Sequence, residues 1–353
     1  MRILHASHAN LKHLGARNYL LPVRINNGFI RNSHEVFWFS DRDVARCSSL
    51  LGTRKFGGIG ATNRKFLEVC KNFAPEVIAL GTVDLLTQDT IAQARRFLPN
   101  TAIFQYYIDP LFIQSNYANV RAKVDVVDIT FVTTGGSILK SISGKGSKTA
   151  FVPNPVDLSI DRHRCHEQLD LDYDVFFSGS SPGKSHPSDL RSHAYQLIQQ
   201  HLPETRCSFW GKGFGKPLWG ANFMEELARA KIGLNFSRYV TASSTGPGSA
   251  VYLYSSDRIA LYQGNGLLVF VPKIFDLREL YGEDSIIEIA GEDDFIEKLG
   301  FYLHNDTLRR TIAQNGYELA HREFNERLVS QYMIESALGV PYSHQYRWPT
   351  DRY

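Results

Sequence analysis

The sequence predicts an α/β protein with two consecutive Rossmann-like units, each a parallel sheet covered by helices. Three observations support this fold class. Short apolar runs alternate with longer amphipathic stretches, as strands alternate with helices. The apolar runs are continuous, which is typical of strands that are buried on both faces. The rhythm also pauses after residue 155 and restarts at residue 173, and 353 residues suit two cores because single domains seldom exceed ~250–300 residues.

The first half, residues 1–155, contains six segments of strand type. Each is a short apolar run bounded by polar or turn-forming residues. We expect strands at Arg2–Ala6, Glu35–Phe39, Val77–Leu80, Thr101–Tyr106, Ile129–Thr133 and Thr149–Val152. Helical spacing of apolar residues predicts helices at Thr62–Phe73 and Gln88–Phe97, and Thr87 and Asp89 are capping candidates for the second. We therefore assign residues 1–155 to an N-terminal domain.

Residues 156–172 are polar and have no sustained period, so we expect them to link the two domains. The strand–helix rhythm then returns over residues 173–325, the second domain. The expected strands are Asp174–Ser178, Arg206–Trp210, Ile232–Phe236, Leu267–Val271 and Ile286–Ile289, and the expected helices are Asp189–His201, Phe223–Ala230, Ser256–Gln263, Asp293–His304 and Thr307–Phe324. A last helix, Glu326–Leu338, opens a segment 326–353 that is expected to return toward the first domain.

Composition excludes several classes of protein. A net charge of +3 is too mild to indicate a nucleic-acid partner, although it is compatible with weak contact to an anionic membrane surface. The chain has no apolar stretch of spanning length and no leader pattern at its start, so we expect a cytoplasmic protein that can also be peripheral to the inner face of the membrane. The four cysteines are widely spaced, and the pair His163 and His166 has no third ligand nearby. We therefore expect neither a metal site nor a cofactor.

Ligand contacts are expected at the carboxyl ends of the strands, because open parallel sheets bind ligands there. Gly179, Ser180 and Lys184 lie in a turn of small residues before a helix, where backbone amides and a cation suit a diphosphate. Gly211 lies in a glycine-rich turn that lets the backbone approach a ligand closely. An ordinary strand-to-helix turn and a surface loop are the alternatives for these two segments.

Two further polar residues follow this pattern. Asn235 ends a buried strand, and Arg258 lies at the start of a short helix, where it can bind a phosphate or a carboxylate with two parallel hydrogen bonds. Gly266 turns the chain into the next strand.

The order of these segments resembles the C-terminal domain of GT-B glycosyltransferases, in particular the CgeB-like, group 1 type. A strand "YDVFFSG" is followed by Arg191 on the next helix, the pair Trp210-Gly211, the strand Lys231–Asn235, the segment Arg258–Gly266 and the helix Ile312–Arg327. The resemblance covers Tyr173 to about Leu338. It implies two Rossmann-like domains that face each other across a cleft, with C-terminal helices. The implied donor-binding residues are Gly179, Ser180, Lys184, Arg191, Gly211, Asn235, Arg258 and Gly266.

One position departs from the family pattern. Leu261 stands three residues after Arg258, where the family usually has a glutamate that is expected to hold the ribose hydroxyls of the donor. Asp257 could take this part if the helix is rotated slightly. The substitution leaves open a catalytically degenerate chain that binds a nucleotide or a sugar without turnover.

GT-B enzymes place the acceptor and any general base at strand ends of the first domain. The candidates here are His8, after the first strand, and Asp109, after the fourth. We expect metal-independent transfer of a sugar from a nucleotide-activated donor to a hydroxyl of a glycan, a lipid-linked acceptor or another molecule. Retention or inversion at the anomeric carbon stays open. A Rossmann oxidoreductase is the remaining alternative, but the turn after the first strand lacks the G-x-G-x-x-G pattern.

Overall fold

The computed structural model describes residues 1–54, 56–179, 190–237 and 245–353. The chain divides into two compact units. Unit 1 comprises Met1–Pro155 and Glu326–Tyr353, and unit 2 comprises Val156–Asn325. Residues 156–172, which the sequence suggests as a linker, thus pack with unit 2, and the C-terminal segment 326–353 packs with unit 1. Ser180 and Lys184 lie outside the described residues.

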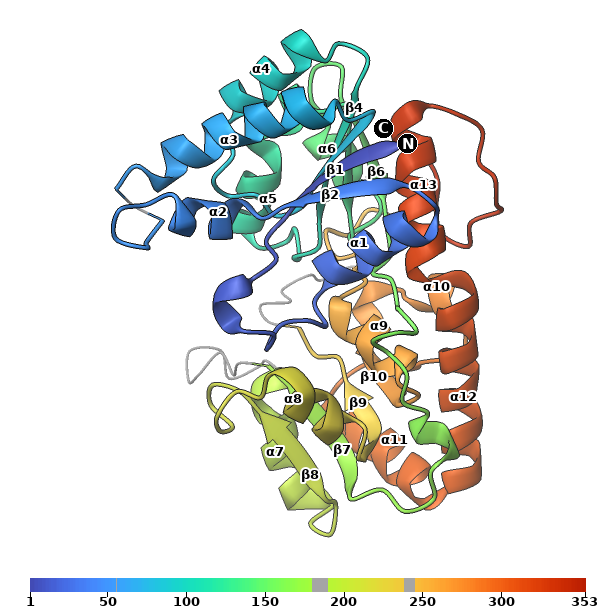
Figure 1. Ribbon diagram of the computed structural model, residues 1–353. Helices are drawn as coiled ribbons and strands as arrows, with labels where there is room; N and C mark the ends of the chain where they lie inside the picture. The colour runs from blue at the N-terminus through green and yellow to red at the C-terminus, as the bar shows by residue number, and fades with distance from the viewer. Residues whose placement is uncertain (55, 180–189, 238–244) are drawn as a thin grey trace. The chain divides into compact units, whose positions relative to one another are not determined.

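Unit 1 is built on a parallel sheet of six strands within the described residues, in the order β2-β1-β3-β4-β5-β6 (Figure 1). Its central strands are apolar and fully buried, because helices cover both faces. The register is continuous across the sheet: Ile3 of β1 pairs with Val36 on one side and Val77 on the other. The strands are β1 Arg2–Ala6, β2 Glu35–Phe39, β3 Val77–Leu80, β4 Ala102–Tyr107, β5 Ile129–Val132 and β6 Lys148–Phe151.

Four α-helices of unit 1, namely α1, α2, α5 and α6, were not predicted from the sequence. Pro22 lies at the start of α1, where its missing N–H is no cost. α1 packs against α13, a helix from the other end of the chain (Figure 1). The helices are η1 Leu11–His13, α1 Leu21–Arg31, α2 Asp41–Cys47, α3 Gly58–Phe73, α4 Gln88–Phe97, α5 Gln114–Arg121, η2 Val124–Val126, α6 Ile138–Ile142 and α13 Glu326–Leu338.

Unit 2 has a second parallel sheet, with five strands in the described residues and the order β11-β10-β9-β7-β8. Its core is formed by apolar side chains of all these strands except β8, together with those of α7, α11 and α12. The strands are β7 Tyr173–Ser178, β8 Cys207–Trp210, β9 Ala230–Leu234, β10 Leu268–Pro272 and β11 Ile287–Ile289. β9 begins two residues before the predicted strand, so Asn235 and Phe236 lie just beyond its carboxyl end.

The helices of unit 2 agree with the predicted ones to within a few residues. α12 packs along α9 and β10 (Figure 1). Among the described residues, no helix is both long enough and apolar enough to cross a membrane. The helices are η3 Cys165–Glu167, α7 Leu190–His201, α8 Gly220–Leu227, α9 Asp257–Gly264, η4 Lys273–Phe275, α10 Arg278–Tyr281, α11 Glu292–His304 and α12 Asp306–Glu323.

Candidate functional site

The carboxyl ends of β7, β8 and β9 form one edge of the unit 2 sheet. Gly179 follows β7, and its N–H donates a hydrogen bond of 3.0 Å to the carbonyl of Trp210, the last residue of β8. Phe236 follows β9 on the other side of β7. Ligands of parallel sheets bind at such an edge. The edge is therefore where the predicted donor contacts should meet.

Two arginines from different helices converge at this edge. Arg191 of α7 and Arg258 of α9 both donate to the carbonyl oxygen of Phe236, at 3.5 and 3.0 Å. Their Cζ atoms also lie over the same ring, that of Phe177 in β7, at 5.3 and 5.5 Å from its centroid. The two guanidinium groups are thus only a few ångströms apart, although 66 residues separate them along the chain.

The two guanidinium groups make the local electrostatic potential strongly positive. Arg191 is only 7% exposed, so its charge is largely removed from water. Nη1 of Arg258 is buried and has no hydrogen-bond partner among the described residues. Like charges at this separation repel each other, most strongly where water is excluded. An anion that accepts hydrogen bonds from both side chains would relieve this repulsion.

Two glycines let the backbone approach the arginines. A Cβ atom on Gly179 would lie 2.2 Å from Nη2 of Arg191. At Gly211, which has a φ of +112°, a Cβ atom would lie 2.2 Å from the carbonyl oxygen of Gly179. Neither position has room for a side chain, and the φ of Gly211 is one that other residues rarely adopt.

Asn235 directly follows β9 and lies close to the start of α9. Its side chain is fully buried, and its Oδ1 accepts a 2.6 Å hydrogen bond from Oγ of Ser256, the residue before α9. Asn235 therefore connects the end of β9 to the start of the helix that carries Arg258.

Comparisons with known proteins bear on the family and the fold. Residues 191–335 match a protein family described as glycosyl transferase-like. The fold is also similar to that of solved glycosyltransferases. An alpha-glucosyltransferase that was solved with UDP and a 13-mer DNA has 12% sequence identity and a TM-score of 0.63. The match covers 96% of this chain and 99% of that one. HepE of Anabaena, solved with UDP, has 14% identity and a TM-score of 0.57 over 96% and 100% of the two chains.

A third solved structure, the sucrose-phosphate synthase of Thermosynechococcus elongatus, has 11% identity and a TM-score of 0.57 over 95% and 98% of the two chains. Among curated proteins, no sequence matches significantly. Residues 191–335 therefore resemble the glycosyl transferase-like family, and the chain has the GT-B fold. The resemblance to the group 1 type of GT-B glycosyltransferase, noted in the sequence, is confirmed.

Gly266, another predicted position of the GT-B chain, lies away from the arginines. Gly266 precedes β10 and thus lies at the amino edge of the sheet, opposite the carboxyl ends. A Cβ atom there would lie 2.4 Å from Nδ1 of His166, so this glycine allows close packing on the segment 156–172. Leu261 is 6% exposed, so its side chain belongs to the core of unit 2.

In unit 1 of the GT-B chain, His8 and Asp109 follow β1 and β4 at the carboxyl edge of the first sheet. Nδ1 of His8 lies 3.3 Å from the carbonyl oxygen of Thr82. Burial lowers the pKa of His8, and the charge of Arg42 lowers it further. The imidazole is therefore mostly neutral near pH 7 and able to accept a proton. Asp109 is exposed to solvent.

A buried polar cluster beneath this edge was missed by sequence analysis. His5 is fully buried in β1, where its Nε2 lies 2.8 Å from the hydroxyl of Tyr106 and 3.1 Å from Oγ of Ser7. Its Nδ1 donates to Oδ1 of Asn26 at 3.0 Å. A histidine in an apolar strand is the only sequence signal for this cluster, since two of its three partners, Asn26 and Tyr106, come from other parts of the chain.

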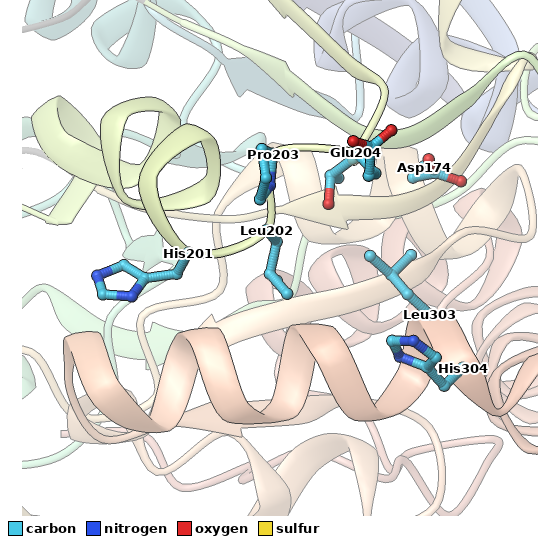
Figure 2. Close-up of a pocket in the computed structure, with 8 residues that line it drawn as sticks. Asp174, His201, Leu202, Pro203, Glu204, Leu303 and His304 are labelled. Carbon is cyan, nitrogen blue, oxygen red and sulfur yellow. The ribbon is translucent and has the colours of Figure 1, made fainter.

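A separate cavity of about 360 Å³ opens at the amino edge of the unit 2 sheet (Figure 2). Asp174 of β7, His201 at the end of α7 and His304 at the end of α11 line it. Arg191 begins α7, so the cavity and the arginines lie at opposite ends of that helix. Among the described residues, no group of three or more histidines, cysteines or carboxylates is placed to hold a metal ion.

Proposed function

We propose that the chain transfers a sugar from a nucleoside diphosphate sugar to a hydroxyl group of a glycan, a lipid-linked acceptor or another molecule, without a metal ion. One observation carries the proposal: Arg191 and Arg258 converge on the carbonyl of Phe236 beside Gly179 and Gly211. A diphosphate has the charge and the acceptor oxygens that such a pair recognises.

The chemistry explains why two arginines are useful here. When the bond between the sugar and the diphosphate breaks, negative charge grows on the leaving phosphate oxygen. Fixed guanidinium groups in a site of low dielectric stabilise this charge without having to reorganise. They therefore supply the charge that a divalent cation provides in metal-dependent transferases. UDP is the first nucleotide to test, because HepE and the alpha-glucosyltransferase were solved with it.

The proton of the acceptor hydroxyl needs a base, and we propose His8 for this part. Its lowered pKa keeps the imidazole neutral at cellular pH. Asp109, at the same edge of the sheet, is the second candidate. Replacing each in turn, as His8→Gln and Asp109→Asn, separates them: the base is the residue whose loss lowers kcat without weakening donor binding.

The test of the donor site is a titration with UDP, GDP, CMP and dTDP, followed by turnover assays with the sugars of the nucleotide that binds. We expect Arg258→Ala to weaken nucleotide binding or turnover about 100-fold or more, since losing one such donor costs ~10²–10³ in rate. Arg229→Ala is the matched control. Arg229 is an exposed arginine of unit 2 that pairs with Asp172 and Glu226, so its loss should change neither quantity.

Three results would contradict the proposal. The first is that the chain binds none of the four nucleotides, and the second is that Arg258→Ala and Arg229→Ala bind nucleotide equally well. Loss of turnover on adding EDTA, with recovery on adding Mg²⁺, would show that the arginines do not suffice. Melting temperatures of both variants near that of the parent chain are required, because a collapsed fold would make Arg258 structural.

Leu261 favours a second candidate function. The family carboxylate for the ribose is replaced here by a buried leucine. A chain that binds a nucleotide without consuming a sugar would therefore keep the arginine site and lose turnover. Stabilisation by UDP, together with no release of UDP from any UDP-sugar, would identify this function.

A further inference from the structure

Six large apolar side chains are exposed on two segments that flank α2 in unit 1. We call the described residues 11–17, 48–54 and 56–59 the α2 surface. The side chains are Leu11 (66% exposed), Leu14 (94%), Leu50 (93%), Leu51 (62%), Phe56 (66%) and Ile59 (44%). Single exposed apolar residues are ordinary, but a group of them marks a surface that binds a partner. Leu14 and Leu50 are the most exposed large apolar residues in the described part of the chain.

The two segments are anchored to α2. The N–H of Leu11 donates to Oδ2 of Asp43 at 3.1 Å, and Oγ of Ser40 donates to the same oxygen at 2.6 Å. A Cβ atom on Gly58 would lie 2.5 Å from the carbonyl oxygen of Ala45, so the start of α3 also packs directly on α2. The apolar side chains thus extend from a fixed framework and do not belong to a chain end.

The backbone at two of these side chains is unusual. Leu14 has a φ of +48° and Phe56 a φ of +54°, in the left-handed region that bulky residues avoid. Most proteins place glycine or asparagine at such positions. Both side chains are exposed, so packing within the chain does not offset the backbone cost. Strain of this kind is concentrated at functional sites.

The charge around these side chains is positive. Residues 11–17 and 41–65 include eight lysines and arginines but only two aspartates, Asp41 and Asp43, and both aspartates are buried. The nearby exposed carboxylate of Asp84 pairs with Arg42 and Arg54. No acidic residue occurs from Val44 to Leu67. Exposed apolar side chains within a basic surround are what an anionic lipid surface binds.

We propose that the α2 surface docks unit 1 on an anionic lipid membrane. The leucines and Phe56 enter the boundary between head groups and acyl chains, and the lysines and arginines contact the lipid phosphates. A second copy of the chain is a poorer partner, because two identical basic surfaces repel each other. A nucleic acid would use the cations and leave the six apolar side chains in water. Docking requires no sugar transfer and so stands apart from the proposed function.

The test is sedimentation of the full chain with phosphatidylcholine vesicles that do or do not contain phosphatidylglycerol. We expect binding to the anionic vesicles, much less to the neutral ones, and a decline as salt rises. The double variant Leu14→Glu with Leu50→Glu should lower binding at least about tenfold, because two apolar contacts are lost and two negative charges are added. The matched control is Leu158→Glu with Leu169→Glu, two leucines of unit 2 that are 60% and 71% exposed, and it should bind as the parent does.

A second variant, Lys12→Glu with Arg64→Glu, reverses two exposed cations while keeping the apolar side chains, and should weaken both the binding to anionic vesicles and its salt dependence. Thermal unfolding of all variants should match the parent chain, since none of these side chains is buried. The proposal fails if the parent chain does not bind anionic vesicles, or if the variant with two leucine replacements binds as well as its control. A parent chain that is dimeric by light scattering, and that becomes monomeric in that variant, would show instead that the surface joins two copies.

Discussion

Gly211 follows β8 and lies directly against the backbone of Gly179, which itself contacts Arg191. We expect Gly211→Ala to destabilise unit 2 by about 2–4 kcal/mol, because the methyl group meets the Gly179 carbonyl and φ stays at +112°. It should also lower nucleotide affinity, since Gly179 must then move relative to Arg191. Urea unfolding and a UDP titration measure the two effects.

Gly215→Ala is the control for this change. A Cβ atom there meets nothing within 4 Å, and its φ is not in the left-handed range. Its stability and UDP affinity should stay within the error of the parent chain. Equal stability of the two alanine variants would show that the turn after β8 adapts easily, and that close backbone contact does not define the site.

His5 should make the stability of unit 1 depend on pH. Burial lowers its pKa from 6.5 to about 4, with the hydrogen bond to Asn26 opposing this shift. The unfolded chain therefore binds a proton between pH 6.5 and 4 that the folded chain does not. The His5 contribution to stability is complete above pH 6.5 and is lost as the pH falls toward 4, by up to about 3 kcal/mol.

The measurement is the free energy of unfolding at pH 7 and pH 5 for the parent chain and for His5→Gln. The parent should lose about 2 kcal/mol more than the variant over this interval. The variant should be less stable at pH 7, because the hydroxyls of Tyr106 and Ser7 lose their nitrogen partner. The same pH dependence in both chains would show that other histidines control it.

At the scale of elements, the strands were predictable because each is a short apolar run that only a sheet buried on both faces explains. α1 was not predictable from its own residues. It contains Asn26, Asn27 and Gly28, which are weak helix formers, and its buried face includes Arg24. The helix is stabilised by packing on α13, about 300 residues later, and no local pattern reports such a contact.

The sequence indicated part of the candidate site as well. Spacing and the family resemblance indicated Gly179, Gly211, Arg191 and Arg258, and these four do converge. The carbonyl of Phe236 could not be predicted, because any residue type has one and its role depends only on position. Gly266 shows the converse limit: a glycine next to a buried strand has the same sequence signature at either edge of a sheet.

The packing of α1 on α13 gives a prediction for the two helices. A Cβ atom on Gly28 would lie 2.2 Å from the carbonyl oxygen of Glu326, so Gly28→Ala forces the helices apart. We expect a loss of about 2–3 kcal/mol in unfolding free energy. Gly60→Ala in α3 is the matched control, because its Cβ would meet only Nη1 of Arg64, at 3.7 Å.

The control should gain up to about 1 kcal/mol from the higher helix propensity of alanine. The two substitutions are chemically identical and both lie within helices. If the unfolding free energy falls in one variant and rises in the other, the difference is due to the contact between α1 and α13. A loss of the same size in both variants would attribute the effect to something other than the approach of α1 to α13.

At the scale of the whole molecule, the two ends of the chain belong to one unit. α13 packs on β4 and β5 as well as on α1, and Tyr332 of α13 meets Phe131 of β5 with ring centroids 5.7 Å apart. The last residue, Tyr353, exchanges hydrogen bonds of 2.8 and 2.9 Å with Thr149 of β6. Unit 2 is therefore one continuous insertion, 156–325, within the residues that form unit 1.

This path predicts unequal behaviour of the two halves when they are made separately. Residues 156–325 hold a complete sheet and core, so this fragment should unfold cooperatively and keep the UDP affinity of the full chain. Residues 1–155 lack α13, which leaves the apolar faces of α1 and β5 uncovered. This fragment should therefore not fold alone.

Val156 and Asn325 are paired as a β-bridge, so residues 155 and 326 lie close together. A short Gly-Ser linker can therefore join 1–155 to 326–353. The joined chain should regain cooperative unfolding by circular dichroism, and a fully folded 1–155 fragment would show that the C-terminal segment is dispensable.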